Sequence, residues 1–313
     1  MLDSHPGIDF KRHIEIELAV QRMRADGSPP TSLEPFYADL ETNLSFQRSG
    51  YTVDRTLDWN ALLQSFVDQS LEESTASIAL TTIHDNFPRA ASVWPNARWL
   101  YLLRDGRDVA TSRMEHGWEG NYWCATAPWL DAERQLAELR KRVPASQIME
   151  VRFEDLVANS VDVLTNICHF LGLEYDEAIF DYLDRTEFRP PDASLAHRWR
   201  MKMKREELQL AEARIGEKLR ERGYPMSDFP PRTVSPREAR RYERENRWQK
   251  RRARIAMVGW RCFLVDLVTR KLGLTRWNTR NRLEMEVRER LKKGIPIPGV
   301  DEDVTEPTPE KTQ

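Results

Sequence analysis

A near-continuous apolar run at residues 98–103 constrains the fold more than any other feature of the sequence. The run, Arg-Trp-Leu-Tyr-Leu-Leu, is typical of a β-strand that is buried on both of its faces. A helical segment is expected from Asp108 onward, and the order of strand then helix recurs at 148–153 and 156–171. Strands that alternate with helices predict an α/β fold with a parallel sheet and crossover helices.

The composition is that of a globular chain, since 40% of the 313 residues are hydrophobic and 31% are charged. The longest apolar stretch near the C-terminus, 255–268, contains Arg261 and Asp266, whereas a membrane span needs about 20 apolar residues with few charges. We therefore expect no transmembrane helix. Three separated cysteines indicate neither a disulfide framework nor a zinc site, and the first residues do not resemble a signal peptide, so we expect a cytoplasmic protein.

Charge is distributed unevenly along the chain, although the formal net charge is only −2. Residues 232–293 contain 20 basic and 7 acidic residues, a net charge of +13, while 1–231 carry −11 and 294–313 carry −4. Prolines cluster around the first boundary. The sequence therefore predicts an α/β domain over 1–231, a basic helical extension over 232–293 and a disordered acidic tail over 294–313.

The most specific motif, Arg-Asp-Gly-Arg-Asp-Val-Ala-Thr-Ser at 104–112, comes directly after the apolar strand. It opens the predicted helix, and a helix N-terminus offers free N–H donors to an anion. Arg104 can bind a phosphate through two N–H groups, Ser112 adds a hydroxyl, and Asp105 or Asp108 can cap the helix. The alternative is that the two Arg–Asp pairs are surface ion pairs at the end of a strand.

Several motifs, in the same order, resemble those of the sulfotransferases that use 3′-phosphoadenosine-5′-phosphosulfate (PAPS). The motif at 104–112 is similar to the 3′-phosphate-binding motif of that family. The other segments that resemble the family, or a bacterial branch of it, are 94–98, 117–129, 151–156, 170–173, 197–200 and 222–224. The resemblance implies a parallel sheet of the P-loop-NTPase-like type flanked by helices. It also implies transfer of a sulfuryl group from PAPS, as cosubstrate, to an acceptor hydroxyl or amine, without a metal.

The resemblance assigns two groups of basic and polar residues to the nucleotide. Arg104 and Ser112 match the positions that bind the 3′-phosphate of PAPS. Arg198 and Arg200, together with Lys202, lie where the family has a second basic cluster near that phosphate. The alternative for this second cluster is a solvated basic face.

His84 is the candidate catalytic base. It follows the β-prone run at 77–83, at the place where the family often has a histidine that activates the acceptor. A neutral imidazole can take a proton from an acceptor hydroxyl or amine, and Asp85 or another carboxylate could orient the ring. The alternative is that His84 caps the next helix or bonds a backbone carbonyl.

One element of the family has no counterpart in this sequence. The family holds the 5′-phosphosulfate with a loop of the type Pro-x-Ser-Gly-Thr-Thr, and this sequence contains no such loop. Residues 1–8 resemble the end of the helix that follows this loop. We expect a natural start further upstream, because a sheet without its central strand leaves buried backbone groups unpaired. The alternative is a non-catalytic homologue that binds a 3′-phosphonucleotide, or an anionic partner through its basic arm.

The basic extension leaves three interpretations open. Its apolar residues at helical spacing are Ile255, Val258, Cys262, Val265, Val268 and Leu272. They could pack on the core or on a second copy in a homo-oligomer, which we favour, or lie on an anionic membrane surface as a peripheral contact. The third interpretation is a polyanion such as a sulfated glycan or RNA, nucleic acid being the least expected partner. We expect the acceptor of the transfer to be a small molecule or a glycan.

Overall fold

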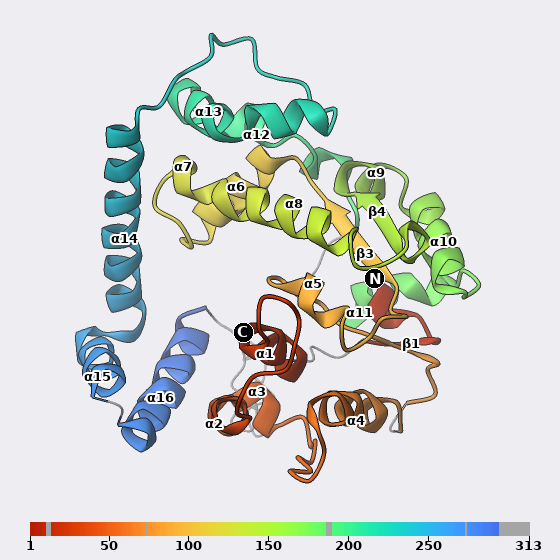
Figure 1. Ribbon diagram of the computed structural model, residues 1–313. Helices are drawn as coiled ribbons and strands as arrows, with labels where there is room; N and C mark the ends of the chain where they lie inside the picture. The colour runs from red at the N-terminus through yellow and green to blue at the C-terminus, as the bar shows by residue number, and fades with distance from the viewer. Residues whose placement is uncertain (11–13, 73, 186–189, 273, 294–313) are drawn as a thin grey trace, which may run out of the picture.

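The computed structural model describes residues 1–10, 14–72, 74–185, 190–272 and 274–293, and the tail predicted over 294–313 lies outside them. Short parallel strands lie among helices, and a long helix near the C-terminus runs along one side of the molecule (Figure 1). The first part of the chain contains η1 (Leu2–Ser4), β1 (Ile8–Phe10), α1 (Ile14–Arg22), α2 (Glu34–Thr42), α3 (Leu44–Gln47), α4 (Trp59–Glu72), β2 (Ile78–Leu80), α5 (Phe87–Ala90), β3 (Trp99–Leu103), α6 (Gly106–Glu115), α7 (Tyr122–Ala125) and α8 (Ala127–Leu139). The second part contains η2 (Ala145–Gln147), β4 (Ile148–Arg152), α9 (Phe153–Ala158), α10 (Ser160–Leu171), η3 (Glu177–Phe180), α11 (Tyr182–Arg185), η4 (Ala193–Leu195), α12 (Trp199–Lys202), α13 (Arg205–Glu221), α14 (Pro236–Val258), α15 (Trp260–Lys271) and α16 (Thr275–Lys293).

The strands of the described chain form two separate two-stranded parallel sheets. β1 pairs with β2 in a register that begins at Ile8 and Ile78, and β3 pairs with β4 in a register that begins at Trp99 and Ile148. The predicted α/β character and the parallel pairing are confirmed. Instead of the single sheet that the sequence predicted, the described strands make two pairs, each with helices around it.

One apolar core joins the two sheets. Side chains from all four strands pack together with side chains of α10. The members that carry this contact are Ile8, Phe10, Ile78, Leu80, Leu100, Met149, Val151, Leu164, Ile167, Cys168 and Leu171. Because apolar burial is the main favourable term in folding, this shared core keeps the two sheets in a fixed relation.

The helix predicted over 156–171 is two helices in the structure. α9 ends at Ala158 and α10 begins at Ser160, since Asn159 between them leaves the helical conformation with φ −136° and ψ 57°. α10 ends where the sequence predicted it, at Gly172. The φ of this glycine is 78°, in the left-handed region that residues with a Cβ adopt only at a cost.

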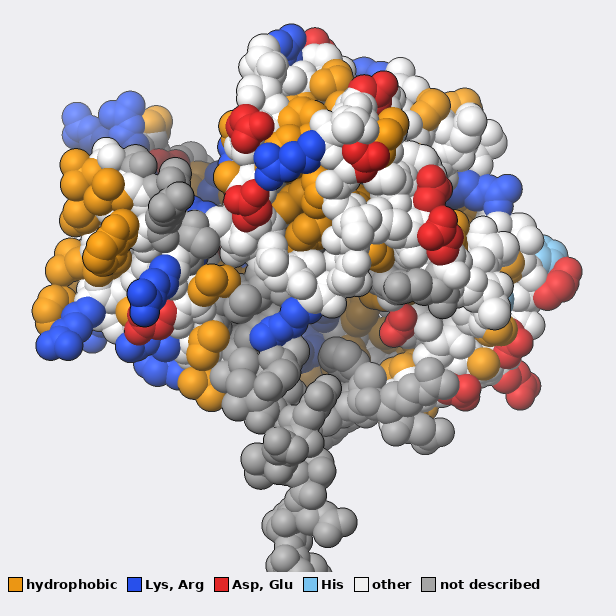
Figure 2. Space-filling view, turned by 90° about the horizontal axis from the view of Figure 1, so that it is seen from below, with side chains coloured by type: hydrophobic (Ala, Val, Ile, Leu, Met, Phe, Trp, Pro, Cys, Tyr) orange, Lys and Arg blue, Asp and Glu red, His pale blue; other side chains and the backbone are white. Residues whose placement is uncertain are grey.

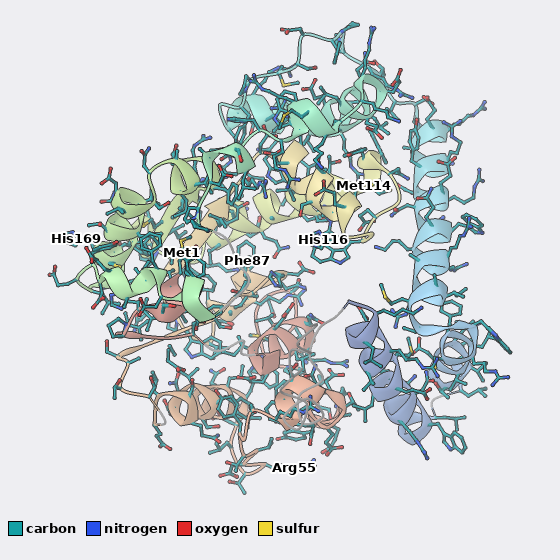
Figure 3. All side chains as sticks on the ribbon, turned by 180° about the vertical axis from the view of Figure 1, so that it is seen from behind. Met1, Arg55, Phe87, Met114, His116 and His169 are labelled. Carbon is teal, nitrogen blue, oxygen red and sulfur yellow. The ribbon has the colours of Figure 1, made fainter. Side chains whose placement is uncertain are left out.

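The N-terminal helices have a core of their own, which α5 connects to the rest of the molecule. Phe36 of α2 meets Trp59 of α4 edge-on, with 5.0 Å between ring centroids. The guanidinium of Arg89 in α5 donates to two backbone carbonyls at the end of α1, at 3.1 and 2.9 Å. Phe87 of α5, near the middle of the molecule in Figure 3, packs on Leu136 of α8. The turn after β2 is thereby held between the N-terminal helices and α8.

The apolar stripe predicted in the basic extension does not form one packed face. Gly259 has φ 85° and ψ 150°, so the helix breaks there into α14 and α15. Of the six stripe residues, Val258 and Cys262 are buried while Ile255, Val265, Val268 and Leu272 are exposed. The spacing predicted helix correctly, but a single glycine with a positive φ separates its two parts.

Candidate functional site

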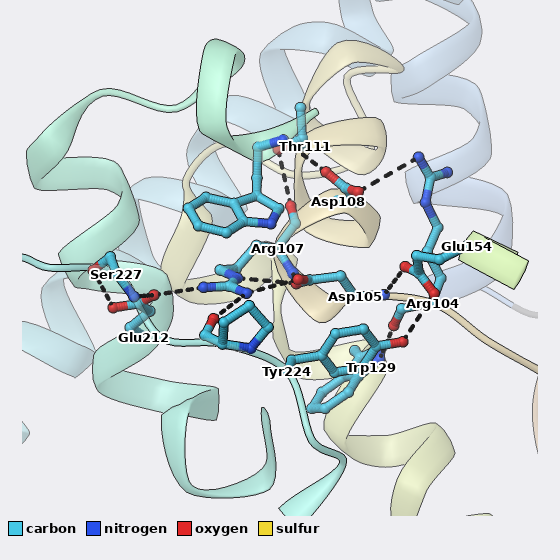
Figure 4. A network of polar contacts seen from close by, with 12 residues as sticks. Arg104, Asp105, Arg107, Asp108, Thr111, Trp129, Glu154, Glu212, Tyr224 and Ser227 are labelled. Carbon is cyan, nitrogen blue, oxygen red and sulfur yellow. Dashed lines mark hydrogen bonds and ion pairs between the residues drawn. The ribbon is translucent and has the colours of Figure 1, made fainter. Parts of the chain in front are cut away.

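The most specific sequence motif occupies the junction between β3 and α6 (Figure 4). Asp105 caps α6 by accepting a hydrogen bond from the N–H of Arg107 at 2.9 Å. The expected cap is confirmed, and it occupies an N–H group that was expected to be free for an anion. The N–H of Arg107 is therefore not available to an anion at this junction.

Arg107 is an internal residue that holds the junction together. Its guanidinium is fully buried and donates to Asp105 at 3.0 and 2.7 Å and to Glu212 at 2.7 Å. It also donates to the carbonyl of Pro225 at 2.8 Å and lies 3.7 Å from the centroid of the Trp199 ring. Asp105, Arg107 and Asp108 are all buried, and Arg107 pairs with Asp105 in the interior, so the alternative of surface ion pairs is wrong for these three residues.

Arg104 lies differently from Arg107. Its guanidinium stacks on Phe153 at 4.2 Å from the ring centroid and donates to the carbonyl of Leu195 at 2.9 Å. Its Nη2 lies 3.9 Å from Oδ2 of Asp108, and the side chain is 21% exposed. Its Nε is buried and meets no hydrogen-bond partner in the part of the chain that the structure describes. Arg104 is therefore held in place while one of its donors is left over.

Asp108 and His197 add two more buried polar atoms of this kind. Within the described residues, Oδ2 of Asp108 and Nδ1 of His197 have no hydrogen-bond partner, although Asp108 binds the N–H of Trp199 through Oδ1 at 2.7 Å. Burial raises the pKa of Asp108 above its ordinary value, because removal from water disfavours the charged carboxylate. Buried polar atoms are nearly always paired, and these atoms, like Nε of Arg104, are exceptions on residues whose charges act on one another at this junction.

The segment that carries the predicted second basic cluster lies across α6. Arg198 and Lys202 both pair with Glu115 at the end of α6, at 3.4 and 3.2 Å. Arg200 is exposed, and its guanidinium lies 5.2 Å from the centroid of the Trp199 ring. The structure thus brings this segment alongside the helix that follows Arg104, with Arg200 turned to solvent.

Ser112 and His84 complete the set of predicted site residues. Ser112 lies half-buried in α6, and His84 lies exposed in the turn between β2 and α5. Oδ1 of the neighbouring Asp85 accepts the N–H of Asn86 at 2.8 Å and the side-chain amide of Gln135 at 2.6 Å. These two bonds engage one oxygen of that carboxylate.

Three further residues, whose part in this junction the sequence did not reveal, hold its backbone. Glu154 accepts the N–H of Asp105 at 2.9 Å and the hydroxyl of Tyr224 at 3.2 Å, and the Trp129 indole donates to the carbonyl of Arg104 at 2.9 Å. Burial, followed by the charge of Glu154, raises the pKa of Tyr224. The only sequence signal for Glu154 and Tyr224 was that each lies in a segment resembling the family.

A family model described as the sulfotransferase family matches residues 1–177, which is more than half of the chain. This chain therefore belongs to the sulfotransferase family. The matched range contains both sheets, the junction between β3 and α6, and the turn with His84. The segments with Arg198 and Tyr224, which contact the junction, follow the matched range.

Two solved structures are similar to this chain. The sulfotransferase domain from the Synechococcus PCC 7002 olefin synthase is 21% identical, and the match covers 70% of this chain and 94% of that domain with a TM-score of 0.43. The sulfotransferase domain from the curacin biosynthetic pathway is 15% identical, with 72% of this chain and 100% of that domain covered and a TM-score of 0.42. A search of curated protein sequences finds no match.

Proposed function

We propose that this sulfotransferase takes its sulfuryl group from PAPS and that Arg104 and Ser112 bind the 3′-phosphate of that nucleotide. The observation that carries the proposal is the buried Nε of Arg104, which meets no partner among the described residues. The stacking on Phe153 and the bond to the Leu195 carbonyl hold the guanidinium in one orientation. A guanidinium held in this way can donate to phosphate oxygens with little further loss of side-chain entropy.

The residues around Arg104 fit a bound phosphate. Arg198 lies on the segment that crosses α6 and adds a second guanidinium, which pairs with Glu115 in this structure. Asp108 is the carboxylate next to Arg104, and burial already disfavours its charged form. The proposal concerns the 3′-phosphate side of PAPS only, and Arg200 would contribute from solvent through long-range charge.

The reaction exchanges one bond to sulfur for another. PAPS supplies the activated sulfuryl group, and adenosine 3′,5′-bisphosphate is the leaving group. The acceptor oxygen or nitrogen forms a bond to sulfur while the bond from sulfur to the bridging phosphate oxygen breaks, and the electron pair stays on that oxygen. The proton of the acceptor hydroxyl or amine passes to a base, and we assign this step to His84, which is exposed and accessible to a small molecule or a glycan.

Calorimetric titration with adenosine 3′,5′-bisphosphate tests the 3′-phosphate site. We expect the wild-type chain to bind and Arg104→Ala to bind about 10- to 100-fold more weakly, because a hydrogen bond to a charged group contributes about 1.5–3 kcal/mol. Arg134→Ala removes an exposed guanidinium from α8 and is the matched control, so it should bind like the wild type. Equal affinities for wild type and Arg104→Ala would remove the proposed site. A screen of hydroxyl and amine acceptors with labelled PAPS tests the transfer itself.

A further inference from the structure

The inward side of α15 carries two polar residues beside Cys262, and most of its exposed side is apolar. Asp266 and Thr269 are buried, at 1% and 5% exposed, whereas Trp260 and Leu264 on the same helix are 60% and 46% exposed. A surface helix in water normally buries its apolar face and exposes its polar one. The inverted arrangement of α15 indicates that its outer side is adapted to something less polar than water.

Hydrogen bonds from α16 fix the polar side of α15. The side-chain amide of Asn278 donates to Oγ1 of Thr269 at 2.9 Å and to Oδ1 of Asp266 at 3.3 Å. The side-chain amide of Asn281 donates to the backbone carbonyl of Cys262 at 2.9 Å. Rotation of α15 about its axis would break these bonds and leave buried polar groups unpaired. The apolar side of α15 is therefore held outward.

The outward side carries an apolar stripe that recurs every four residues. It begins at Trp260 and Leu264 and continues with Val268 and Leu272, which are 48% and 66% exposed. Trp277, 71% exposed, adds apolar surface just beyond the end of α15. Figure 2 shows hydrophobic side chains gathered at the left edge of the molecule, where α15 lies, with Lys and Arg side chains beside them. Contiguous exposed apolar surface of this kind marks a contact site.

The charged residues that lie close to this stripe in the sequence are basic, with one exception. Between residues 246 and 283 the sequence has eleven Lys or Arg residues and a single acid, Asp266, which is buried. Arg254 and Arg261 are exposed, and the guanidinium of Arg261 lies 5.5 Å from the ring centroid of Trp260. An apolar stripe with tryptophan at its end and arginine along its flanks is typical of helices that lie in the headgroup region of an anionic bilayer.

We propose that α15 binds the surface of an anionic lipid bilayer, with its apolar stripe among the headgroups and the neighbouring arginines on lipid phosphates. Because the stripe runs along the length of α15, the bound helix lies parallel to the surface. No helix in the described ranges is long and apolar enough to cross a bilayer. A second copy of the chain would bring two segments of +13 together, which is electrostatically unfavourable. A polyanion would neutralise the arginines but leave the apolar stripe in water. An anionic bilayer would both neutralise the arginines and remove the stripe from water.

Co-sedimentation of the full chain with lipid vesicles tests this proposal. We expect binding to mixed phosphatidylcholine and phosphatidylglycerol vesicles and much weaker binding to phosphatidylcholine alone. The double variant Leu264→Ser/Val268→Ser should bind the mixed vesicles at least about tenfold more weakly than the wild type, because each substitution removes apolar area that the bilayer would bury. Val161→Ser, which changes an equally exposed side chain on α10, is the matched control and should bind like the wild type. Arg254→Glu/Arg261→Glu should abolish the preference for anionic vesicles.

The other candidate partners of the α15 stripe, a second copy of the chain and a polyanion, would give different results. A wild-type chain that ignores anionic vesicles, or a stripe variant that binds them as well as the wild type, overturns the proposal. A wild-type dimer in light scattering that the stripe substitutions convert to a monomer assigns the stripe to a second copy and also overturns it. Binding to heparin or RNA in place of vesicles, unaffected by the stripe substitutions, overturns it in favour of a polyanion. Circular dichroism shows whether each variant is folded, and the arginine variant gives a second test that leaves the stripe intact.

Discussion

The backbone N–H of Asp105 donates a hydrogen bond of 2.9 Å to the carboxylate of Glu154, and this bond joins the ends of two parallel strands. Asp105 follows β3, and Glu154 lies in the first turn of α9, directly after β4. Arg107 then holds the side chain of Asp105 from the interior. Because this corner is fixed on both sides, Arg104 next to it has a defined position from which to meet a ligand.

Replacement of Arg107 should destabilise the fold more than replacement of a surface arginine. We expect Arg107→Ala to lower the free energy of unfolding by about 3–5 kcal/mol, because it leaves the buried carboxylate of Asp105 without its cationic partner. Urea unfolding followed by tryptophan fluorescence measures the change. Arg200→Ala, which removes an exposed guanidinium from the same region, should change it by less than about 0.5 kcal/mol. A similar decrease in the free energy of unfolding in both variants would show that the buried Arg107–Asp105 pair contributes no more to stability than an exposed arginine.

The raised pKa of Asp108 should appear as a pH dependence of stability. A carboxyl whose pKa is higher in the folded state binds more protons there than in the unfolded chain, so its contribution to stability falls as pH rises above about 4. Asp108→Asn removes this effect but keeps an oxygen for the N–H of Trp199. The stability of Asp108→Asn relative to the wild type should therefore be greater at pH 7 than at pH 4.

Asp192 supplies a control of opposite sign for that measurement. Hydrogen bonds from Ser194 lower the pKa of Asp192, so its charged form is the favoured one in the folded state. Asp192→Asn should therefore lose more stability relative to the wild type at pH 7 than at pH 4. If the Asp108→Asn data followed the same direction as those for Asp192→Asn, the burial argument for Asp108 would be wrong.

The sequence predicted the position of the motif better than the arrangement of its side chains. The strands at 99–103 and 148–152 were predictable from their β-prone and apolar residues, but the expected burial of the first strand on both faces is wrong, since only Leu103 is buried there and Leu102 is 57% exposed. The sequence did not predict whether Arg104 or Arg107 points inward. Arg107 is held by bonds to Glu212 and Pro225, which lie 105 and 118 residues further along the chain. Contacts of such separation leave no local pattern, so the motif alone could not distinguish the internal arginine from the one that faces the site.

The C-terminal helices also show that a local sequence pattern does not predict which side chains are packed. Periodicity predicted an apolar face over 255–272, but a periodic pattern does not specify whether that face is packed or exposed. The outcome depends on Gly259, which redirects the chain, and on Asn278, which binds the polar side of α15. Each of these is a single polar or flexible residue whose effect exists only once the helices meet.

The docking of α14 should depend on one buried amide. Asn246 accepts the N–H of Gly120 and donates to Glu119 at 2.6 Å, and these bonds join α14 to the loop before α7. Asn246→Ala leaves both groups without that partner, so we expect α14 to detach more often and to be cleaved faster by trypsin at its arginines. Glu243→Ala, an exposed change on the same helix, should be cleaved at the wild-type rate. Equal cleavage of both variants would mean that other contacts hold α14.

His84 should affect turnover without affecting nucleotide binding. With an acceptor found by the screen, we expect His84→Ala to lower kcat by about 10²–10⁴-fold, the usual contribution of a positioned general base. Its affinity for adenosine 3′,5′-bisphosphate should stay at the wild-type value, because the 3′-phosphate site is assigned to Arg104 and Ser112. His169→Ala is the matched control, since His169 is exposed on the outer side of α10 (Figure 3). If His84→Ala had the same kcat as His169→Ala, the acceptor proton would go to another group. If His84→Ala lost nucleotide binding, His84 would instead belong to the nucleotide site.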